Sequence, residues 1–345
     1  MVNAPKSYKL EFKNKQTLLG MPKDRDWALI SNYADKSLMK NYLMYHLATK
    51  MGMPYAPRCE YVELYLNKEY LGVYLLTETI KKSQNRVNLR QDEMSYIVEI
   101  DAKFRDGEQV IFSDVISPGG KPFHIHEPQN ASIESLDLLE TFIQSFEKYL
   151  KGISFEKNNG LEQWVDIDEY IKHYWLQEFS KNPDANFYTS VYFSWTRNGV
   201  VNMGPIWDFD LSFGGHRNEV TSLPTGWHIK NSYWNNYIFR DSVLENSRIR
   251  FWQENKEKFL GLSADADSLY GFLENAAQNN FLRWNILNHI GTDYHFAAYE
   301  TYRAAVDDLK KWIEERYDWI DGEMPKGTVS KIFVNPLNSS SSPGL

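Results

Sequence analysis

The segment that most constrains the fold of this chain is an apolar hairpin near its middle. Two apolar runs, VYFSW at residues 191–195 and VVNMGPIW at residues 200–207, flank the tetrapeptide TRNG. Asn198 and Gly199 both tolerate a positive φ angle, which is the backbone conformation that a tight turn between two strands requires. The pattern therefore predicts two antiparallel strands whose outer ends lie side by side.

Polar side chains cluster at both outer ends of this hairpin. Asn182, Asp184 and Asn186 precede its first strand, and Asp208 and Asp210 follow its second strand in GPIWDFDLSFGG. Because a hairpin brings its ends together, these groups should converge, and carboxylate and amide oxygens are ligands suited to Mg²⁺. Such residues are commonly only solvated turn formers. Asp208 directly follows the apolar run PIW, however, where an unpaired carboxylate is costly, so we interpret the stretch as a metal site.

The first eighty residues have the pattern of strand, strand, helix, strand, strand. Alternating apolar and polar residues predict half-buried strands, and apolar residues four positions apart predict a helix. The expected elements are strands at 7–12 and 27–33, a helix from Asp35 to Met51, and a hairpin at 61–76. Asp35 or Ser37 is the expected N-cap of the helix, and Gly52 lies just past its end. This order is typical of a small β-rich lobe with one helix.

The rest of the chain is mainly helical after about Ile133. The expected elements are a strand at 96–101 and helices at 136–150, 167–179 and 297–321. We therefore expect an α+β fold of two lobes, with an N-lobe of about residues 1–80 and a C-lobe of about residues 81–334. Residues 335–345 are rich in Ser, Pro and Gly, which predicts a linker or a disordered tail.

Composition narrows the class of partner. The 345 residues include 38 Lys and Arg against 46 Asp and Glu, for a formal net charge of −8. This balance argues against a general binder of nucleic acid or anionic membranes, and favours a small molecule or a protein, in particular a basic one. The single cysteine, Cys59, excludes an intramolecular disulfide and a cysteine zinc cluster. No apolar run reaches the length of about 18 residues that a membrane span needs.

Five segments carry a resemblance to a known family. They are WALISNYADKSLMKNYLMYHLATKMGMP, YVELYLNKEYLGVYLLTETI, YIVEID, GPIWDFDLSFGG and LKKWIEERYDWID. In this order they resemble the CotH family, bacterial spore-coat kinases and secreted relatives with an atypical protein-kinase-like fold. The resemblance implies transfer of phosphate from ATP, with Mg²⁺ or Mn²⁺, to Ser or Thr of an exported or coat protein. It also implies a location outside the cell, at the cell surface or in the spore coat.

The resemblance assigns roles to the residues at the hairpin ends. Asp208 matches the metal-binding Asp of the Asp-Phe-Gly element of kinases, and Asp184 matches the Asp of the catalytic loop. Asn186 is the candidate for the metal-binding Asn, although it follows Asp184 by two positions where typical kinases have five. Asp210 belongs to the family pattern WDFD, as a second metal ligand or an orienting group. Because DFD replaces DFG, we do not expect a mobile activation switch.

The residues expected to bind ATP differ more from those of ordinary kinases. The first thirty residues contain no G-x-G-x-x-G phosphate loop. A lysine is still required, because Mg²⁺ alone does not neutralise the charge of ATP. Lys9 is the first candidate, followed by Lys13 and Lys40. Glu78, at the end of the last strand of the N-lobe, is the candidate for the hinge next to adenine.

Two other sequence features and two alternative functions remain beside the kinase interpretation. The HIHE stretch at 124–127 places two imidazoles close together, but a metal site needs more ligands, so we leave it unassigned. The aromatic residues Trp227, Trp234 and Tyr237 form a carbohydrate or peptide platform, or, more commonly, part of a core. The alternative functions are a non-catalytic surface or adhesion module and AMP transfer on the same fold.

Overall fold

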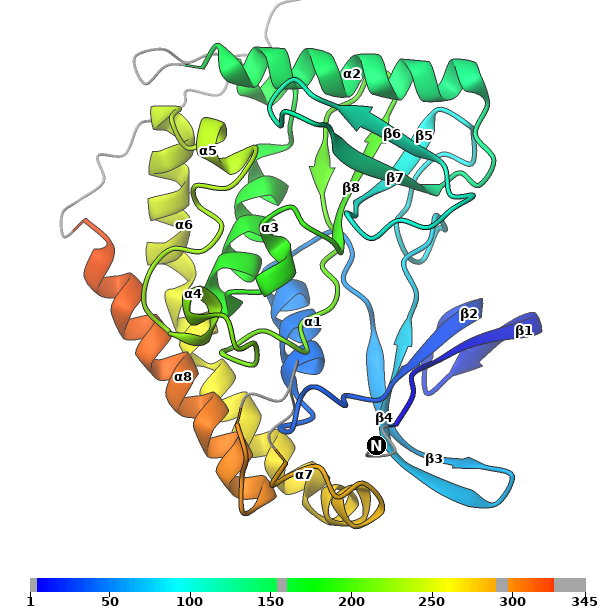
Figure 1. Ribbon diagram of the computed structural model, residues 1–345, viewed down its shortest axis with the longest axis vertical. Coiled ribbons are helices and arrows are strands. Elements are labelled where there is room, and N and C mark those ends of the chain that lie inside the picture. Colours follow the sequence, from blue (N-terminus) through cyan, green and yellow to red (C-terminus); the bar gives the residue numbers. More distant parts are fainter. Residues whose placement is uncertain (1–4, 154–159, 290–296, 326–345) are drawn as a thin grey trace, which may run out of the picture.

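The computed structural model describes residues 5–153, 160–289 and 297–325 of the chain (Figure 1). The expected tail at 335–345 lies outside these residues. Two antiparallel sheets and a group of helices form a mixed α+β fold, as the sequence predicts. None of the helices described is both long enough and apolar enough to cross a membrane.

The first sheet contains the four strands of the first eighty residues, in the spatial order β1-β2-β4-β3. Their bounds are β1 (Tyr8–Leu18), β2 (Met21–Ile30), β3 (Cys59–Leu66) and β4 (Glu69–Glu78). All four strands predicted here are confirmed; β1 continues to Leu18, beyond its predicted end, and β2 starts at Met21 and ends at Ile30, earlier than predicted at both ends. One face of the sheet covers a small apolar cluster that includes Trp27, Leu29 and Leu76.

Helix α1 (Lys40–Lys50) begins later than predicted. Asp35 does not cap it directly, because a turn at 36–37 and a bend at Leu38 separate Asp35 from Met39, the residue at the N-cap position. The carboxylate of Asp35 instead accepts hydrogen bonds from the backbone N–H groups of Ser37, at 2.9 Å, and Lys40, at 2.8 Å. Asp35 therefore anchors the approach to α1 from outside the helix.

The second sheet has five strands in the order β6-β7-β5-β8-β9. Their bounds are β5 (Ser95–Ile100), β6 (Val110–Ser113), β7 (Lys121–Glu127), β8 (Val191–Thr196) and β9 (Asn202–Met203). The sequence predicts β5 and the β8–β9 hairpin but not the sheet that unites them. This hairpin is shorter than expected: β9 has two residues, and Pro205, which has no backbone N–H, follows Gly204 at its end.

Helices pack around both sheets. Their bounds are α2 (Ile133–Lys151), α3 (Ile167–Ser180), α4 (Glu219–Ser222), α5 (Asn235–Ile238), α6 (Ser242–Leu260), α7 (Leu262–Arg283) and α8 (Tyr302–Glu323). Helix α2 lies across the second sheet in Figure 1. Helix α8 starts at Tyr302 rather than 297, with Thr301 as its N-cap.

The helical part of the chain also closes over the first sheet. The indole N–H of Trp284, at the C-terminal end of α7, donates to the carbonyl of Leu71 at 2.8 Å, and the side chain of Asn280, within α7, accepts from the N–H of Val73 at 3.0 Å. Between these contacts, a Cβ on Gly72 would lie 2.4 Å from the Asn280 oxygen. Only glycine fits there, so the sheet and α7 are held in close contact through the backbone.

Candidate active site

Asn182 joins the two ends of the hairpin. It follows the C-terminus of α3 and starts a single 3-10 turn at Pro183–Ala185. Its side-chain oxygen accepts from the backbone N–H of Asp184 at 3.3 Å, and its side-chain nitrogen donates to the carbonyl of Asp208 at 3.0 Å. The structure therefore brings the segments of Asp184 and Asp208 together, as the hairpin predicts.

Asp208 is held in an unusual backbone conformation. Its φ angle is 63°, in the left-handed region that, apart from glycine, asparagine and aspartate adopt most readily. The next residue, Phe209, is fully buried, and its N–H donates to the side chain of Asn41 on α1 at 2.8 Å. The hydroxyl of Ser190 lies 3.4 Å from a carboxylate oxygen of Asp208. The buried Phe209 thus fixes the position of the two aspartates on either side of it.

The three carboxyl groups repel one another. Burial raises the pKa of Asp208 above its ordinary value, and the charge of Asp184 raises it further. Burial, followed by the charge of Asp208, raises the pKa of Asp210 to about 8. Burial also raises the pKa of Asp184. These groups favour a bound cation, because a cation would stabilise their charged forms.

Lys40 is the lysine that the structure places beside the DFD element. Its ammonium donates to the carbonyl of Asp210 at 3.3 Å. Burial lowers the pKa of Lys40, and the charges of Asp35, Asp210 and Asp308 oppose that effect. A Cβ at Gly215 would lie 2.3 Å from the Lys40 nitrogen. The glycine that ends GPIWDFDLSFGG thus leaves room for this ammonium.

The other predicted residues are not joined to this group. Asn186 is exposed at the end of the 3-10 turn, and no contact among the described residues links it to Asp208. Lys9 and Lys13 are exposed on β1. Lys9 lies opposite Ala28, which lies opposite Thr77, so it shares a sheet face with side chains of β4 that pack toward α1.

Glu78 is the last residue of β4, as the sequence predicts, but its carboxylate is already paired. It is fully buried and accepts hydrogen bonds from Arg58, at 3.1 Å from the backbone N–H and at 2.9 Å from the guanidinium. Glu78 lies opposite Trp27, one position from the pair Ala28 and Thr77. Because side chains alternate along a strand, Glu78 and Lys9 lie on opposite faces of the first sheet.

Sequence reasoning missed two charged residues near the carboxyl groups. Asp101 follows β5, and the hydroxyl of Thr189 donates to it at 2.6 Å. Lys103 is exposed, and its charge lowers the pKa values of both Asp184 and Asp208. The sequence does contain a pattern that identifies Asp101: the aspartate directly follows the apolar strand in YIVEID, just as Asp208 directly follows the apolar run PIW. Lys103 has no such signal, since its place depends on the loop after β5.

The aromatic cluster belongs largely to the core. Trp234 is fully buried against Phe123, Phe146 and Phe193. The ring of Trp227 lies near the guanidinium groups of Arg248 and Arg316, at 5.1 and 6.0 Å from its centroid. These contacts confirm core packing over an exposed binding platform for Trp234.

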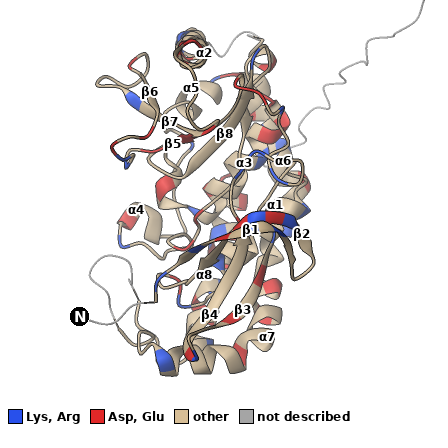
Figure 2. Ribbon diagram, turned by 90° about the vertical axis from the view of Figure 1, so that its right-hand side faces the viewer, with Lys and Arg blue, Asp and Glu red and all other residues tan. Residues whose placement is uncertain are grey.

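Charged residues of both signs are scattered over many elements of the ribbon in Figure 2. A family model described as CotH kinase protein matches residues 2–320, nearly the whole chain. A search of curated proteins found no match. The family match confirms the resemblance carried by the five segments.

Proposed function

The chain belongs to the CotH kinase family, and from this premise we propose that it transfers the γ-phosphate of ATP to serine or threonine of a protein. The family implies a kinase-like fold, and it is associated with spore coats. We propose that the substrate is an exported or coat protein. A basic substrate would complement the net charge of −8.

The observation that carries the proposal is that Asn182 bridges the backbones of Asp184 and Asp208, while the charge of Asp184 acts on Asp208 and that of Asp208 on Asp210. Their oxygen atoms are the hard donors that Mg²⁺ prefers, and their mutual repulsion is relieved by a cation. We propose Asp208 and Asp210 as metal ligands, with Asn186 as a further candidate. A bound Mg²⁺ would neutralise charge on the phosphates of ATP.

Asp184 is the proposed catalytic residue. Burial raises its pKa, so its carboxylate is a better proton acceptor than an exposed aspartate. In this role Asp184 orients the hydroxyl of the substrate and accepts its proton. Lys103, whose charge acts on both Asp184 and Asp208, is placed to attract an anionic group near them.

Three residues are the proposed candidates for binding the nucleotide. Lys9 lies on the face of the first sheet that packs toward α1, and Lys40 lies beside Asp210. Either ammonium would offset phosphate charge, and Lys9 remains the first candidate because Lys40 already contacts the Asp210 carbonyl. Glu78 remains the candidate for the hinge, where its contacts to Arg58 favour a role in positioning the backbone next to adenine.

Intact-mass spectrometry after incubation with ATP and Mg²⁺ or Mn²⁺, with and without a basic Ser- and Thr-containing protein, tests the proposal. We expect added phosphate on the chain or the acceptor, and at least about a hundredfold less with Asp208→Asn in the same time. Asp114→Asn, an exposed aspartate away from the site, is the matched control and should retain the activity. Added AMP would replace the proposal by nucleotidyl transfer, and no added mass under any condition would favour the adhesion module.

A further inference from the structure

A second group of metal-ligating side chains lies outside the carboxylate site, on the second sheet. Glu99 on β5 lies directly opposite His124 on β7, and His126 follows two residues later. One ligand atom from each of the three lies within 4.8 Å of the others. We propose that Glu99, His124 and His126 bind one divalent transition-metal ion of the zinc type.

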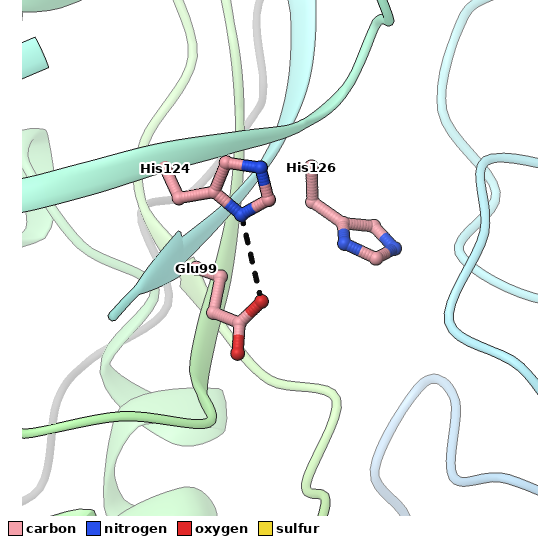
Figure 3. Close-up of side chains that lie close together, drawn as sticks. All are labelled: Glu99, His124 and His126. Carbon is pink, nitrogen blue, oxygen red and sulfur yellow. Dashed lines mark ion pairs between the residues drawn. The ribbon is translucent and has the colours of Figure 1, made fainter. Parts of the chain in front are cut away.

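The three side chains share the face of the sheet that looks away from α2. Their neighbours Val98, Ile100 and Phe123 point to the opposite face and belong to the main core. Figure 3 shows the Glu99 carboxylate below the ring of His124, with the ring of His126 beside them. The group is half-buried, so an ion could reach it from solvent while water competes only in part for the ligands.

His126 has the hydrogen bond that orients a metal ligand. Ile97 pairs with Glu127 and Val98 with Ile125, so His126 is the extra residue of a β-bulge, a feature that redirects side chains. Its Nε2 lies 3.0 Å from the carbonyl of Ile80. A carbonyl only accepts, so Nε2 carries the hydrogen and the lone pair is on Nδ1. This arrangement is the one that metal-binding histidines usually have.

His124 and Glu99 face each other without a direct hydrogen bond. Nδ1 of His124 is buried and has no hydrogen-bond partner in the described part of the chain. It forms an ion pair with a Glu99 oxygen at 3.6 Å, drawn in Figure 3, which is longer than a hydrogen bond. Tyr192, opposite Glu99 on β8, interacts with the Glu99 carboxylate through its hydroxyl. A cation between His124 and Glu99 would bind Nδ1 of His124 and the Glu99 carboxylate, which also interacts with the hydroxyl of Tyr192.

The types of ligand atom determine which metal ion the site would prefer. Two imidazoles and one carboxylate suit Zn²⁺ and its neighbours, whereas Mg²⁺ prefers oxygen donors alone. Three protein ligands leave the fourth position of a tetrahedral zinc ion for water. Through the Ile80 contact of His126, the ion would also tie the second sheet to the segment that follows β4. The site therefore differs in chemistry from the three aspartates and does not depend on the proposed phosphate transfer.

Calorimetric titration with ZnCl₂ tests the site, using tag-free protein that carries Asp208→Asn to weaken the aspartate cluster. We expect one equivalent of Zn²⁺ to bind and Mg²⁺ to give no comparable signal. Adding His126→Ala should weaken Zn²⁺ binding by about tenfold or more. His289→Ala removes an exposed histidine elsewhere and should leave the affinity unchanged.

Glu99→Gln, which preserves the shape of the side chain, provides a second variant, and circular dichroism checks that each variant is folded. The visible absorption of bound Co²⁺ reports directly on the ligands, and it should change in Glu99→Gln and disappear in His126→Ala. Equal Zn²⁺ affinity in the His126→Ala and His289→Ala proteins would overturn the proposal, as would absence of Zn²⁺ binding before these changes.

Discussion

Two groups of buried charge lie six residues apart at the end of α3, and they are built in opposite ways. Glu178 and Arg316 form an ion pair at 2.8 Å in which both side chains are fully buried. Glu178 also accepts from the backbone N–H groups of Ile229, at 2.8 Å, and Lys230, at 3.0 Å. Asp184, by contrast, shares its surroundings with Asp208 and other acids.

The difference separates a structural role from a functional one. Charge at Glu178 is balanced within the chain, so the pair can hold α3 against α8 whether or not a ligand is present. Charge at Asp184 and Asp208 is not balanced by a contacting cation in the described part of the chain, which costs stability. Such an arrangement is typical of a site that receives its positive charge from outside.

Breaking the balanced pair should have the largest effect. Arg316→Met leaves Glu178 buried without its counter-ion, which should lower the free energy of unfolding by about 3–5 kcal/mol. Urea denaturation measures this loss. Arg303→Met, which removes the ion pairs of a 40% exposed guanidinium with Asp267 and Asp307, should cost at most about 1 kcal/mol. Equal losses in the two variants would remove the distinction between Glu178 and a surface carboxylate.

Removing one acid from the unbalanced group should lower activity without lowering stability. Asp208→Asn should reduce phosphate transfer about a hundredfold or more, as loss of comparable electrostatic stabilisation does. Asparagine also tolerates the left-handed backbone at this position. The metal-free variant should therefore melt no earlier than the wild type. Turnover near the wild-type rate would exclude Asp208 from the mechanism.

Supplying the missing positive charge should stabilise the protein. ATP with Mg²⁺ at a hundredfold excess over its dissociation constant should add about 2.7 kcal/mol of stability, seen as a shift in a melting scan. ATP with chelator should give little shift, because the carboxylates repel the triphosphate. Asp208→Asn should give little shift in either condition. A full shift in chelator would contradict binding through a metal.

His173, also on α3, shows a third way to bury a titratable group. Burial lowers its pKa to about 4, so it stays neutral in the folded protein at pH 5. The unfolded chain binds a proton below about pH 6.5, so this contribution to stability is present above that pH and is lost as the pH falls. Between pH 7 and 5 the wild type should lose about 2 kcal/mol relative to His173→Phe.

Denaturation of both proteins at several pH values measures this difference. The comparison separates the effect of His173 from that of Glu169. Burial raises the pKa of Glu169 to about 7, so its contribution to stability changes with pH in the opposite direction. Parallel pH profiles for the two proteins would show that His173 does not titrate as its burial implies.

The smallest effect is expected at the exposed lysines. Lys9→Ala should raise the apparent KM for ATP or lower kcat by roughly tenfold, equivalent to about 1.4 kcal/mol, and Lys13→Ala should do less. Steady-state kinetics with ATP as the varied substrate measures both. Equal and small effects would move the search for the phosphate-binding cation to Lys40.

Local patterns predicted most elements and part of the site. The strands and the helix form where the apolar patterns predict them, but β4 is buried on both faces and α1 on most sides, because other parts of the chain cover the faces that the patterns leave to solvent. The segments of Asp184 and Asp208 meet because they flank the hairpin that turns at Asn198 and Gly199, and Asn182 joins them. The register of β5 between β7 and β8 could not be predicted, since it joins segments nearly a hundred residues apart.

The sequence by itself determined that acids and amides flank a hairpin, because turn chemistry and apolar runs are local. Only the tertiary structure decided which of these groups meet. Asn182, not Asn186, bridges the two ends, and Glu78 is held by Arg58 on the face of the sheet opposite Lys9. Likewise the histidines of HIHE acquire a third ligand only because Glu99 pairs opposite His124. Such contacts depend on strand pairing and packing, which bring together side chains that no short segment contains.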